Sequence, residues 1–160
     1  MEIERKYLIK TLPANLEQYP KTNIEQGYLC MNPTLRIRKK GDAYIFTYKS
    51  RQQESEHIQT CVNQEIELPL TKEAYEHLCK KTDGILVRKT RYCIPYGPYT
   101  IELDLFKAPY EDLQLAEVEF PTTEEAEQFS PPEWFGENVS DDKRYTNSFL
   151  SKCENLDVFL

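Results

Sequence analysis

Charged residues recur at every second position in six separate segments of the chain. The pairs are Glu2 and Glu4 (continued by Lys6), Arg36 and Arg38, Glu65 and Glu67, Lys89 and Arg91, Glu102 and Asp104, and Glu117 and Glu119. Successive side chains of a β-strand point to opposite faces, so each pair lies on one face of its strand. In five of the six segments the residue between the charges is apolar. The spacing therefore predicts strands with one charged face and one apolar face.

A single strand of this kind is typical of a sheet that faces water on one side. Six of them favour a barrel in which the charged face points inward and helices cover the apolar face. Enclosed charges are tolerated when opposite signs pair or when a ligand neutralises them. Guanidinium and ammonium groups suit phosphate oxygens, and clustered carboxylates suit a hard divalent cation. The pattern therefore predicts a tunnel that binds a metal ion and a polyphosphate.

The order of these segments resembles that of the CYTH superfamily of triphosphate tunnel metalloenzymes. The family's amino-terminal signature, Glu-x-Glu-x-Lys, corresponds to Glu2-Ile3-Glu4-Arg5-Lys6. The resemblance continues in order through Leu35-Arg36-Ile37-Arg38, Thr47-Tyr48-Lys49, Glu65-Ile66-Glu67-Leu68, Arg88-Lys89-Thr90-Arg91-Tyr92, Glu102-Leu103-Asp104, Glu117-Val118-Glu119 and Asp142-Lys143-Arg144-Tyr145-Thr146-Asn147. It implies one tunnel domain over residues 1–160 with an α+β, mostly β fold. That fold is a closed antiparallel barrel of eight strands with a charged lumen and a few helices packed outside.

The resemblance also implies roles for the charged residues. The metal ion, Mg²⁺ or Mn²⁺, is expected on five carboxylates: Glu2, Glu4, Asp104, Glu117 and Glu119. The phosphates are expected on cations of several segments: Lys6, Arg36, Arg38, Lys49, Lys89, Arg91 and Arg144. Glu65, Glu67 and Glu102 are expected to support these cations, which would otherwise repel one another. The expected catalytic set is Glu2, Glu4, Lys6 and Lys89.

The reaction implied by the resemblance is hydrolysis of a terminal phosphoanhydride by in-line attack of water. We identify no added nucleoside-binding segment in this short chain, which favours inorganic tripolyphosphate as substrate, with pyrophosphate and phosphate as products. Thiamine or nucleoside triphosphatase, RNA-capping triphosphatase and class IV adenylate cyclase stay open as alternatives within the superfamily. A non-catalytic polyphosphate-binding barrel is a further alternative, although an anion binder gains nothing from carboxylates in its site.

Composition restricts the partners and the location. A net charge of −7 and a pI near 5.0 argue against a general nucleic-acid binder. Tyr44, Phe46 and Tyr48 are expected to pack under helices, not to stack on single-stranded nucleic acid. We find no signal peptide and no apolar run that could span a bilayer, so the expected location is the cytoplasm, with no membrane partner. The oligomeric state, monomer or homodimer, stays open.

The chain has five cysteines, an odd number, and no Cys-x-x-Cys motif, so neither a disulfide framework nor a tetrahedral zinc site is expected.

Local signals predict the order of the secondary structure. Helices are expected over residues 13–19, after Thr71, after Thr122 or Thr123, and over residues 143–156. Strands are expected over residues 2–9, 22–31, 34–39, 43–49, 65–67, 85–94, 99–106 and 113–120.

Overall fold

The computed structural model describes residues 1–54 and 60–159. This part of the chain contains nine strands: β1 (Glu2–Ile9), β2 (Lys21–Met31), β3 (Thr34–Lys40), β4 (Ala43–Glu54), β5 (Cys61–Pro69), β6 (Asp83–Tyr96), β7 (Tyr99–Phe106), β8 (Gln114–Phe120) and β9 (Phe135–Asn138). Its α-helices are short: α1 (Lys72–Cys79), α2 (Thr123–Gln128) and α3 (Asn147–Leu150). Three 3₁₀ turns complete it: η1 (Leu16–Gln18), η2 (Lys143–Tyr145) and η3 (Asp157–Phe159).

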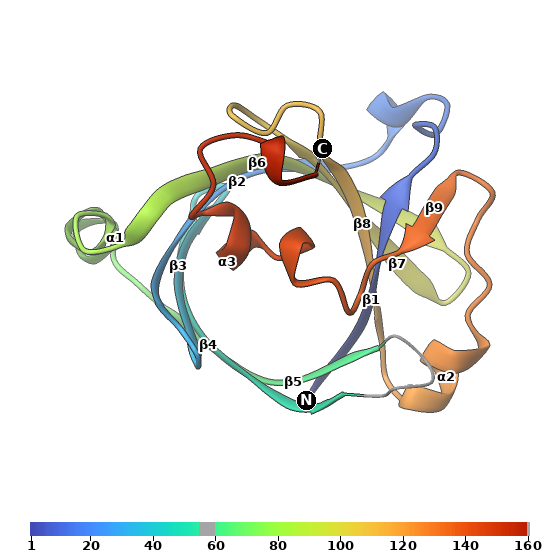
Figure 1. Ribbon diagram of the computed structural model, residues 1–160, viewed down its shortest axis with the longest axis horizontal. Helices are drawn as coiled ribbons and strands as arrows, with labels where there is room; N and C mark the ends of the chain where they lie inside the picture. Colours follow the sequence, from blue (N-terminus) through green and yellow to red (C-terminus); the bar gives the residue numbers. More distant parts are fainter. Residues whose placement is uncertain (55–59, 160) are drawn as a thin grey trace.

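The first eight strands close into an antiparallel barrel, seen end-on in Figure 1. Their order around the barrel is β5-β4-β3-β2-β6-β7-β8-β1, and β1 pairs with β5 through Glu2–Asn63 and Glu4–Cys61 to complete the ring. The ninth strand, β9, adds to the other end of β1 and was not predicted. The closed eight-stranded barrel expected from the sequence is confirmed.

The strand register places the charged positions on the inner face. Glu4 lies opposite Glu119 and Lys6 opposite Glu117 on β1 and β8, while Arg91 lies opposite Asp104 on β6 and β7. Directly opposed residues of antiparallel strands share a face. Three of the residues between these charges, Ile3, Leu103 and Val118, are buried on the outer face in one apolar cluster with Phe129 and with Phe135 of β9.

Two helices cover parts of the outer surface, and both begin at predicted caps. Thr71 Oγ1 accepts a hydrogen bond from Ala74 N at 3.1 Å at the start of α1, and Thr122 Oγ1 accepts one from Glu125 N at 3.1 Å at the start of α2. Such caps satisfy backbone donors that the first helical turn leaves free. Within the described chain, no helix combines the length and the apolar character needed to cross a membrane.

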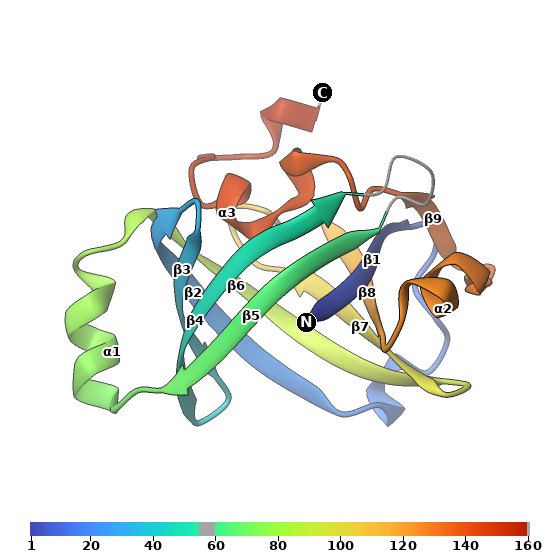
Figure 2. The same cartoon turned by 90° about the horizontal axis from the view of Figure 1, so that it is seen from below.

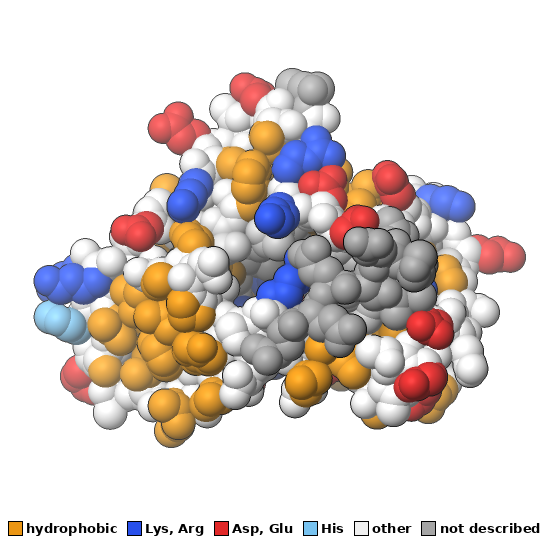
Figure 3. Space-filling view, turned by 60° about the horizontal axis from the view of Figure 1, so that its bottom comes forward, with side chains coloured by type: hydrophobic (Ala, Val, Ile, Leu, Met, Phe, Trp, Pro, Cys, Tyr) orange, Lys and Arg blue, Asp and Glu red, His pale blue; other side chains and the backbone are white. Residues whose placement is uncertain are grey.

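The outer face of β4 and β5 is covered less than the sequence suggested. Tyr44 packs on Tyr75 of α1 with ring centroids 5.1 Å apart. Phe46 and Tyr48 are only half-buried, and they lie opposite the exposed Leu68 and Ile66 on β5. Figure 3 shows hydrophobic side chains gathered beside α1 on this side of the molecule. Phe46 and Tyr48 therefore pack less fully under helices than predicted, because α1 lies beside β3 and does not extend over β5 (Figure 2).

The C-terminal segment, residues 139–159, does not contain the single helix predicted over residues 143–156. Thr146 has an extended backbone, and its Oγ1 accepts a hydrogen bond from Phe149 N at 3.2 Å, so it ends η2 and starts α3. The helix predicted over residues 13–19 is likewise reduced to the 3₁₀ turn η1. Figures 1 and 2 together show η2 and α3 lying across one end of the barrel.

Apolar side chains fill that end of the barrel. Val87, Phe106 and Leu115 lie two positions from charged inward-facing residues on their strands, so they also face the interior. They form a buried cluster with Val139 and Leu150 of the C-terminal segment. The rest of the interior keeps its charged side chains and forms the cavity described next.

Candidate functional site

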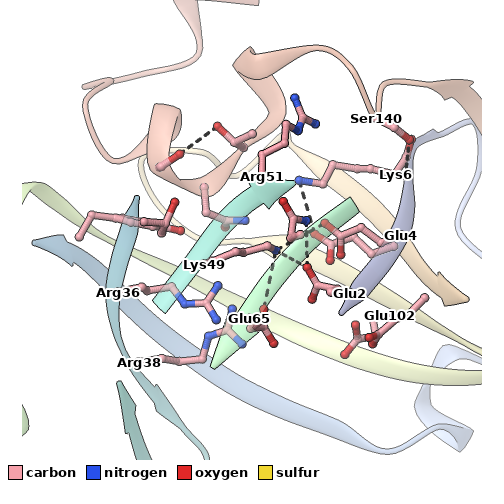
Figure 4. Close-up of a pocket in the computed structure, with 18 of the residues that line it drawn as sticks. Glu2, Glu4, Lys6, Arg36, Arg38, Lys49, Arg51, Glu65, Glu102 and Ser140 are labelled. Carbon is pink, nitrogen blue, oxygen red and sulfur yellow. Dashed lines mark hydrogen bonds and ion pairs between the residues drawn. The ribbon is translucent and has the colours of Figure 1, made fainter. Parts of the chain in front are cut away.

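The charged inner faces of the strands enclose a cavity of about 430 Å³. Figure 4 shows side chains from several strands converging on it. All but two of the residues predicted for the site line this cavity: Glu2, Glu4, Lys6, Arg36, Arg38, Lys49, Glu65, Glu67, Lys89, Arg91, Glu102, Glu117 and Glu119. The two residues outside its lining are Asp104 and Arg144.

Arg36 and Arg38 on β3 are held by neutral groups. Arg38 Nε donates to Gln26 Oε1 at 2.9 Å, and Arg36 Nη2 donates to Thr47 Oγ1 at 3.2 Å. Neither guanidinium forms an ion pair with another described residue. Arg36 Nε is buried and has no hydrogen-bond partner there. Because a buried unsatisfied donor is costly, both arginines are suited to receive an anionic ligand.

Burial also affects the charge of Arg38. Burial, with Arg36 and Arg91 nearby, lowers the pKa of the Arg38 guanidinium to about 9. Desolvation and like charges both disfavour the protonated form. Arg38 is still a cation at neutral pH, and an added anion would relieve the repulsion within this group.

Carboxylates of β1 and β8 form the facing wall. Burial, together with the neighbouring Glu117 and Glu2, raises the pKa of Glu4 to about 7, although Lys49 opposes this. Burial disfavours ionisation of Glu117 as well, but Lys6, Arg91 and Lys89 hold its pKa well below the usual range. Partial burial and the charges of Glu2 and Glu4 raise the pKa of Glu119. The ionised forms of Glu4 and Glu119 are therefore disfavoured in this wall, and a further cation would favour them.

Lys49 connects three of the carboxylates. Its Nζ lies 2.6 Å from Glu2 Oε1, 3.7 Å from Glu4 Oε1 and 3.8 Å from Glu65 Oε2 (Figure 4). Although burial favours the neutral amine, Glu4 and Glu2 raise its pKa. Asn63, which sequence reasoning missed, donates from Nδ2 to Glu2 Oε1 at 3.2 Å. Lys49 thus lies among carboxylates in this structure, not within the arginine group of β3.

Asp104 lies outside the cavity lining and is paired with two cations. Its Oδ1 lies 2.7 Å from Arg91 Nε, and its Oδ2 lies 2.7 Å from Lys89 Nζ and 2.9 Å from Arg91 Nη2. Burial would raise its pKa, but Lys89 and Arg91 lower it. Both carboxylate oxygens of Asp104 thus contact Lys89 or Arg91, which line the cavity, while Asp104 itself lies behind them. Asp104 is thus paired with Lys89 and Arg91 in this structure, and its predicted role as a metal ligand stays a prediction, while Glu102 accepts from Arg91 Nη1 at 3.0 Å.

Arg144 also lies outside the cavity lining. Its guanidinium pairs with Asp142, with 2.7 Å between Nη2 and Oδ2, and lies over the rings of Tyr145 and Phe159. Its side chain is 45% exposed. The turn of η2 directs this side chain away from the cavity, and Lys143 lines the cavity instead. Adjacent residues of a 3₁₀ turn point in different directions, so the sequence motif could not decide between them.

Sequence reasoning missed other residues of the cavity wall. Arg51 extends the Lys49 spacing by one more step, which is the signal that could have revealed it. Tyr28 accepts a hydrogen bond from Gln26 Nε2 at 2.9 Å, behind Arg38. Ser140 and Asn147 come from the C-terminal segment, where no strand periodicity marks them. Lys6 meets this segment too, because its Nζ donates to Tyr145 O at 2.9 Å.

The carboxylates suit a divalent cation by chemistry but are not gathered into a finished site. Among residues 1–54 and 60–159, no group of three or more His, Cys, Asp or Glu side chains is placed to hold a metal ion. Lys49 lies between Glu2, Glu4 and Glu65. Burial, with neighbouring carboxylates, nevertheless raises the pKa values of Glu2, Glu4 and Glu119, and a hard cation such as Mg²⁺ would favour their ionised forms by taking them as oxygen ligands.

Comparison with known proteins places these observations in a family. The family model for the CYTH domain matches residues 1–148. An inorganic triphosphatase of Nitrosomonas europaea is 41% identical over 157 residues, which cover 94% of this chain and 96% of the relative. An inorganic triphosphatase of Acetivibrio thermocellus is 30% identical over 155 residues, covering 94% of this chain and 93% of the relative.

Solved structures share the fold. The crystal structure of an inorganic triphosphatase superposes with a TM-score of 0.67 at 36% identity, covering 98% of this chain and 97% of the other. A putative adenylyl cyclase from Hippeastrum, described as having a dominant triphosphatase activity, superposes with a TM-score of 0.55 at 16% identity over 80% of this chain and 83% of its own. At that identity the second likeness concerns the fold alone.

Proposed function

The chain belongs to the CYTH domain family, and we propose that it is a metal-dependent triphosphatase that hydrolyses inorganic tripolyphosphate to pyrophosphate and phosphate. The observation that carries the proposal is one cavity with two unlike walls. Arg36 and Arg38 lack carboxylate partners among the described residues, whereas burial and neighbouring carboxylates raise the pKa values of Glu2, Glu4 and Glu119 on the other wall. A polyphosphate bound with a divalent cation neutralises both walls at once. The names of the two triphosphatase relatives support the same activity.

The cations of the chain would bind and stabilise the phosphate groups. Arg36 and Arg38 offer forked donors that match phosphoryl oxygens. Lys89 and Arg91 are fixed by Asp104, so their positions are set before substrate arrives. Hydrogen-bond donors held in place are effective at the charge that develops on the leaving pyrophosphate. Lys6, at 3.5 Å from Glu117, would bridge the phosphate chain and the carboxylate wall.

Glu2, Glu4, Glu117 and Glu119 would hold the divalent cation, either Mg²⁺ or Mn²⁺. When bound, such an ion supplies positive charge that neutralises phosphate oxygens and polarises water. Glu65 and Glu67 would balance the cations of β4 and β3, since Glu65 lies near Lys49 and Glu67 Oε2 accepts from Thr47 Oγ1 at 3.4 Å. The apolar plug of Val139 and Leu150 would exclude bulk water from one end. Because the barrel joins β1 to β5 and β8, we also infer one domain over residues 1–160.

A panel of substrates tests the proposal. We expect kcat/KM for tripolyphosphate to exceed that for ATP and thiamine triphosphate by about tenfold or more. The cavity selects its ligand by the charge and length of the phosphate chain, so an organic group would have to be accommodated outside it. Pyrophosphate spans fewer cations and should be a poor substrate or an inhibitor. Phosphate release is measured for all four compounds with Mg²⁺ and with Mn²⁺, and cyclic AMP is assayed with ATP.

The outcomes of the panel separate the alternatives. If ATP or thiamine triphosphate is the best substrate, the inorganic substrate is wrong while the tunnel mechanism survives. Cyclic AMP with pyrophosphate would indicate a cyclase. If no compound is hydrolysed with either metal, the protein is a binding barrel and the enzymatic proposal fails.

Thermal stability tests the anion site separately. A ligand that binds only the folded state raises the melting temperature, so tripolyphosphate should raise it far more than orthophosphate does. The Arg36→Ala/Arg38→Ala variant should lose this difference. The matched control is Lys21→Ala/Lys39→Ala, which removes the same charge from exposed positions and should keep it. Equal shifts of the wild type with both ligands would mean that no polyphosphate-length site exists.

A further inference from the structure

Asn147 brings the C-terminal segment into contact with the cation wall. It is the first residue of α3, directly after the Thr146 cap, and it lines the cavity. Figures 1 and 2 show α3 at the end of the barrel, inside the ring of strands in the end-on view. Lys89 Nζ, which is fully buried, donates to Asn147 Oδ1 at 3.1 Å. A neutral residue from outside the barrel strands thus touches one of the proposed substrate-binding cations.

The chemistry of this contact orients the whole amide. An ammonium group can only donate hydrogen bonds, so the amide oxygen of Asn147 must face Lys89. The amide nitrogen, on the same carbon atom, then points away from Lys89. Among residues 1–54 and 60–159 this nitrogen has no hydrogen-bond acceptor, and it is not one of the fully buried polar atoms. This nitrogen is therefore available to a ligand, and Asn147 is part of the cavity lining.

Two polar contacts orient the ammonium group of Lys89. One of its three N–H bonds is directed to Asp104 Oδ2 at 2.7 Å and a second to Asn147 Oδ1. Phe106 lies beneath the ammonium, 5.4 Å from Nζ to the ring centroid. Asp104 and Asn147 together therefore fix the direction of the remaining N–H. Without Asn147, only one polar contact would orient this ammonium.

We propose that Asn147 is a further substrate-binding residue of the triphosphatase site. Its Oδ1 positions Lys89, and its Nδ2 donates a hydrogen bond to a phosphoryl oxygen of the bound triphosphate. This inference rests on the proposed function. A neutral donor adds a contact to phosphate without adding repulsion to a wall that already contains Arg36, Arg38, Lys89 and Arg91.

Two substitutions separate the two roles. Asn147→Ala removes both the acceptor for Lys89 and the donor to phosphate, and we expect it to lower kcat/KM for tripolyphosphate about tenfold. Asn147→Asp has the same size and keeps an acceptor for Lys89, but it replaces the donor with a negative charge. We expect kcat/KM of this variant to fall about a hundredfold or more, mainly through a raised KM, because the carboxylate repels the phosphate. It should fold, since an acidic residue is favourable in the first turn of a helix.

The experiment compares kinetics and ligand-induced thermal shifts of wild type, both variants and the control Asn155→Ala. Asn155 is exposed, lies in the same C-terminal segment and is absent from the cavity wall. The inference is supported if efficiency falls in the order wild type, Asn147→Ala, Asn147→Asp, with the smallest tripolyphosphate shift for Asn147→Asp. If the wild type is active and kcat/KM of Asn147→Asp equals or exceeds that of Asn147→Ala, this inference alone is overturned. A wild type that neither binds nor hydrolyses tripolyphosphate would overturn the proposed function and this inference together.

Discussion

Replacing Glu4 with glutamine is expected to lower kcat for tripolyphosphate by about a hundredfold or more at saturating Mg²⁺. The amide has the shape of the carboxylate but removes one negative charge from the wall proposed to hold the cation. Glu4 lines the cavity two positions after Glu2 and directly opposite Glu119 of β8. Turnover is measured by phosphate release over a range of Mg²⁺ concentrations.

The melting temperature distinguishes this effect from a loss of fold. Burial and neighbouring carboxylates raise the pKa of Glu4, so its charged form is disfavoured in the folded protein. The neutral Glu4→Gln side chain should therefore leave the melting temperature without Mg²⁺ unchanged or higher. Glu111→Gln, at an exposed loop position, is the control and should keep full activity. Activity of Glu4→Gln close to that of the wild type at saturating Mg²⁺ would contradict the metal-binding role of Glu4.

The largest effect on stability is expected at Asp104. Asp104→Asn leaves Lys89 and Arg91 buried without their shared carboxylate, and breaking a buried ion pair from one side costs about 3–5 kcal/mol. For a domain of this size such a loss corresponds to a decrease in melting temperature of roughly 6–20 °C. Thermal or denaturant unfolding of the ligand-free protein provides the measurement. Asp112→Asn, at an exposed position, should change the melting temperature little.

Tripolyphosphate should partly restore the stability of Asp104→Asn. The added anion would replace some of the negative charge lost beside Lys89 and Arg91, so the ligand-induced rise in melting temperature should be larger than in the wild type. A metal-ligand role for Asp104 predicts the opposite: a nearly normal melting temperature without ligand and a loss of activity that high Mg²⁺ relieves. That result would contradict the counter-ion role that its contacts indicate.

The barrel and most of its lining could be predicted because they follow from a local rule. A spacing of two places Glu2 with Glu4, or Arg36 with Arg38, on one face of any strand, whatever the rest of the chain does. Five apolar intervening residues indicate that much of the opposite face is covered. The ordered resemblance to the CYTH superfamily then supplied the closure that spacing alone leaves open.

The roles within the lining could not be predicted, because they depend on which charges meet across the barrel. Glu102 and Asp104 lie two positions apart on the same strand and face the same side. Even so, Asp104 lies behind the wall against Lys89 and Arg91, while Glu102 lines the cavity. Lys49 is predicted among the phosphate-binding cations, and only the closure of β5 on β1 shows that Glu2, Glu4 and Glu65 surround it. Such pairings join residues far apart in the chain.

The sequence by itself determined the charged inner face, the apolar outer face and the family to which the order of motifs points. Only the tertiary structure decided what closes the barrel end: Val139 and Leu150 fill it, Arg144 turns outward, and Asn147 reaches Lys89. The physical reason is that strand periodicity fixes the direction of a side chain within its own element. The C-terminal segment consists of short turns without such a period, so its contacts are set by the barrel on which it packs.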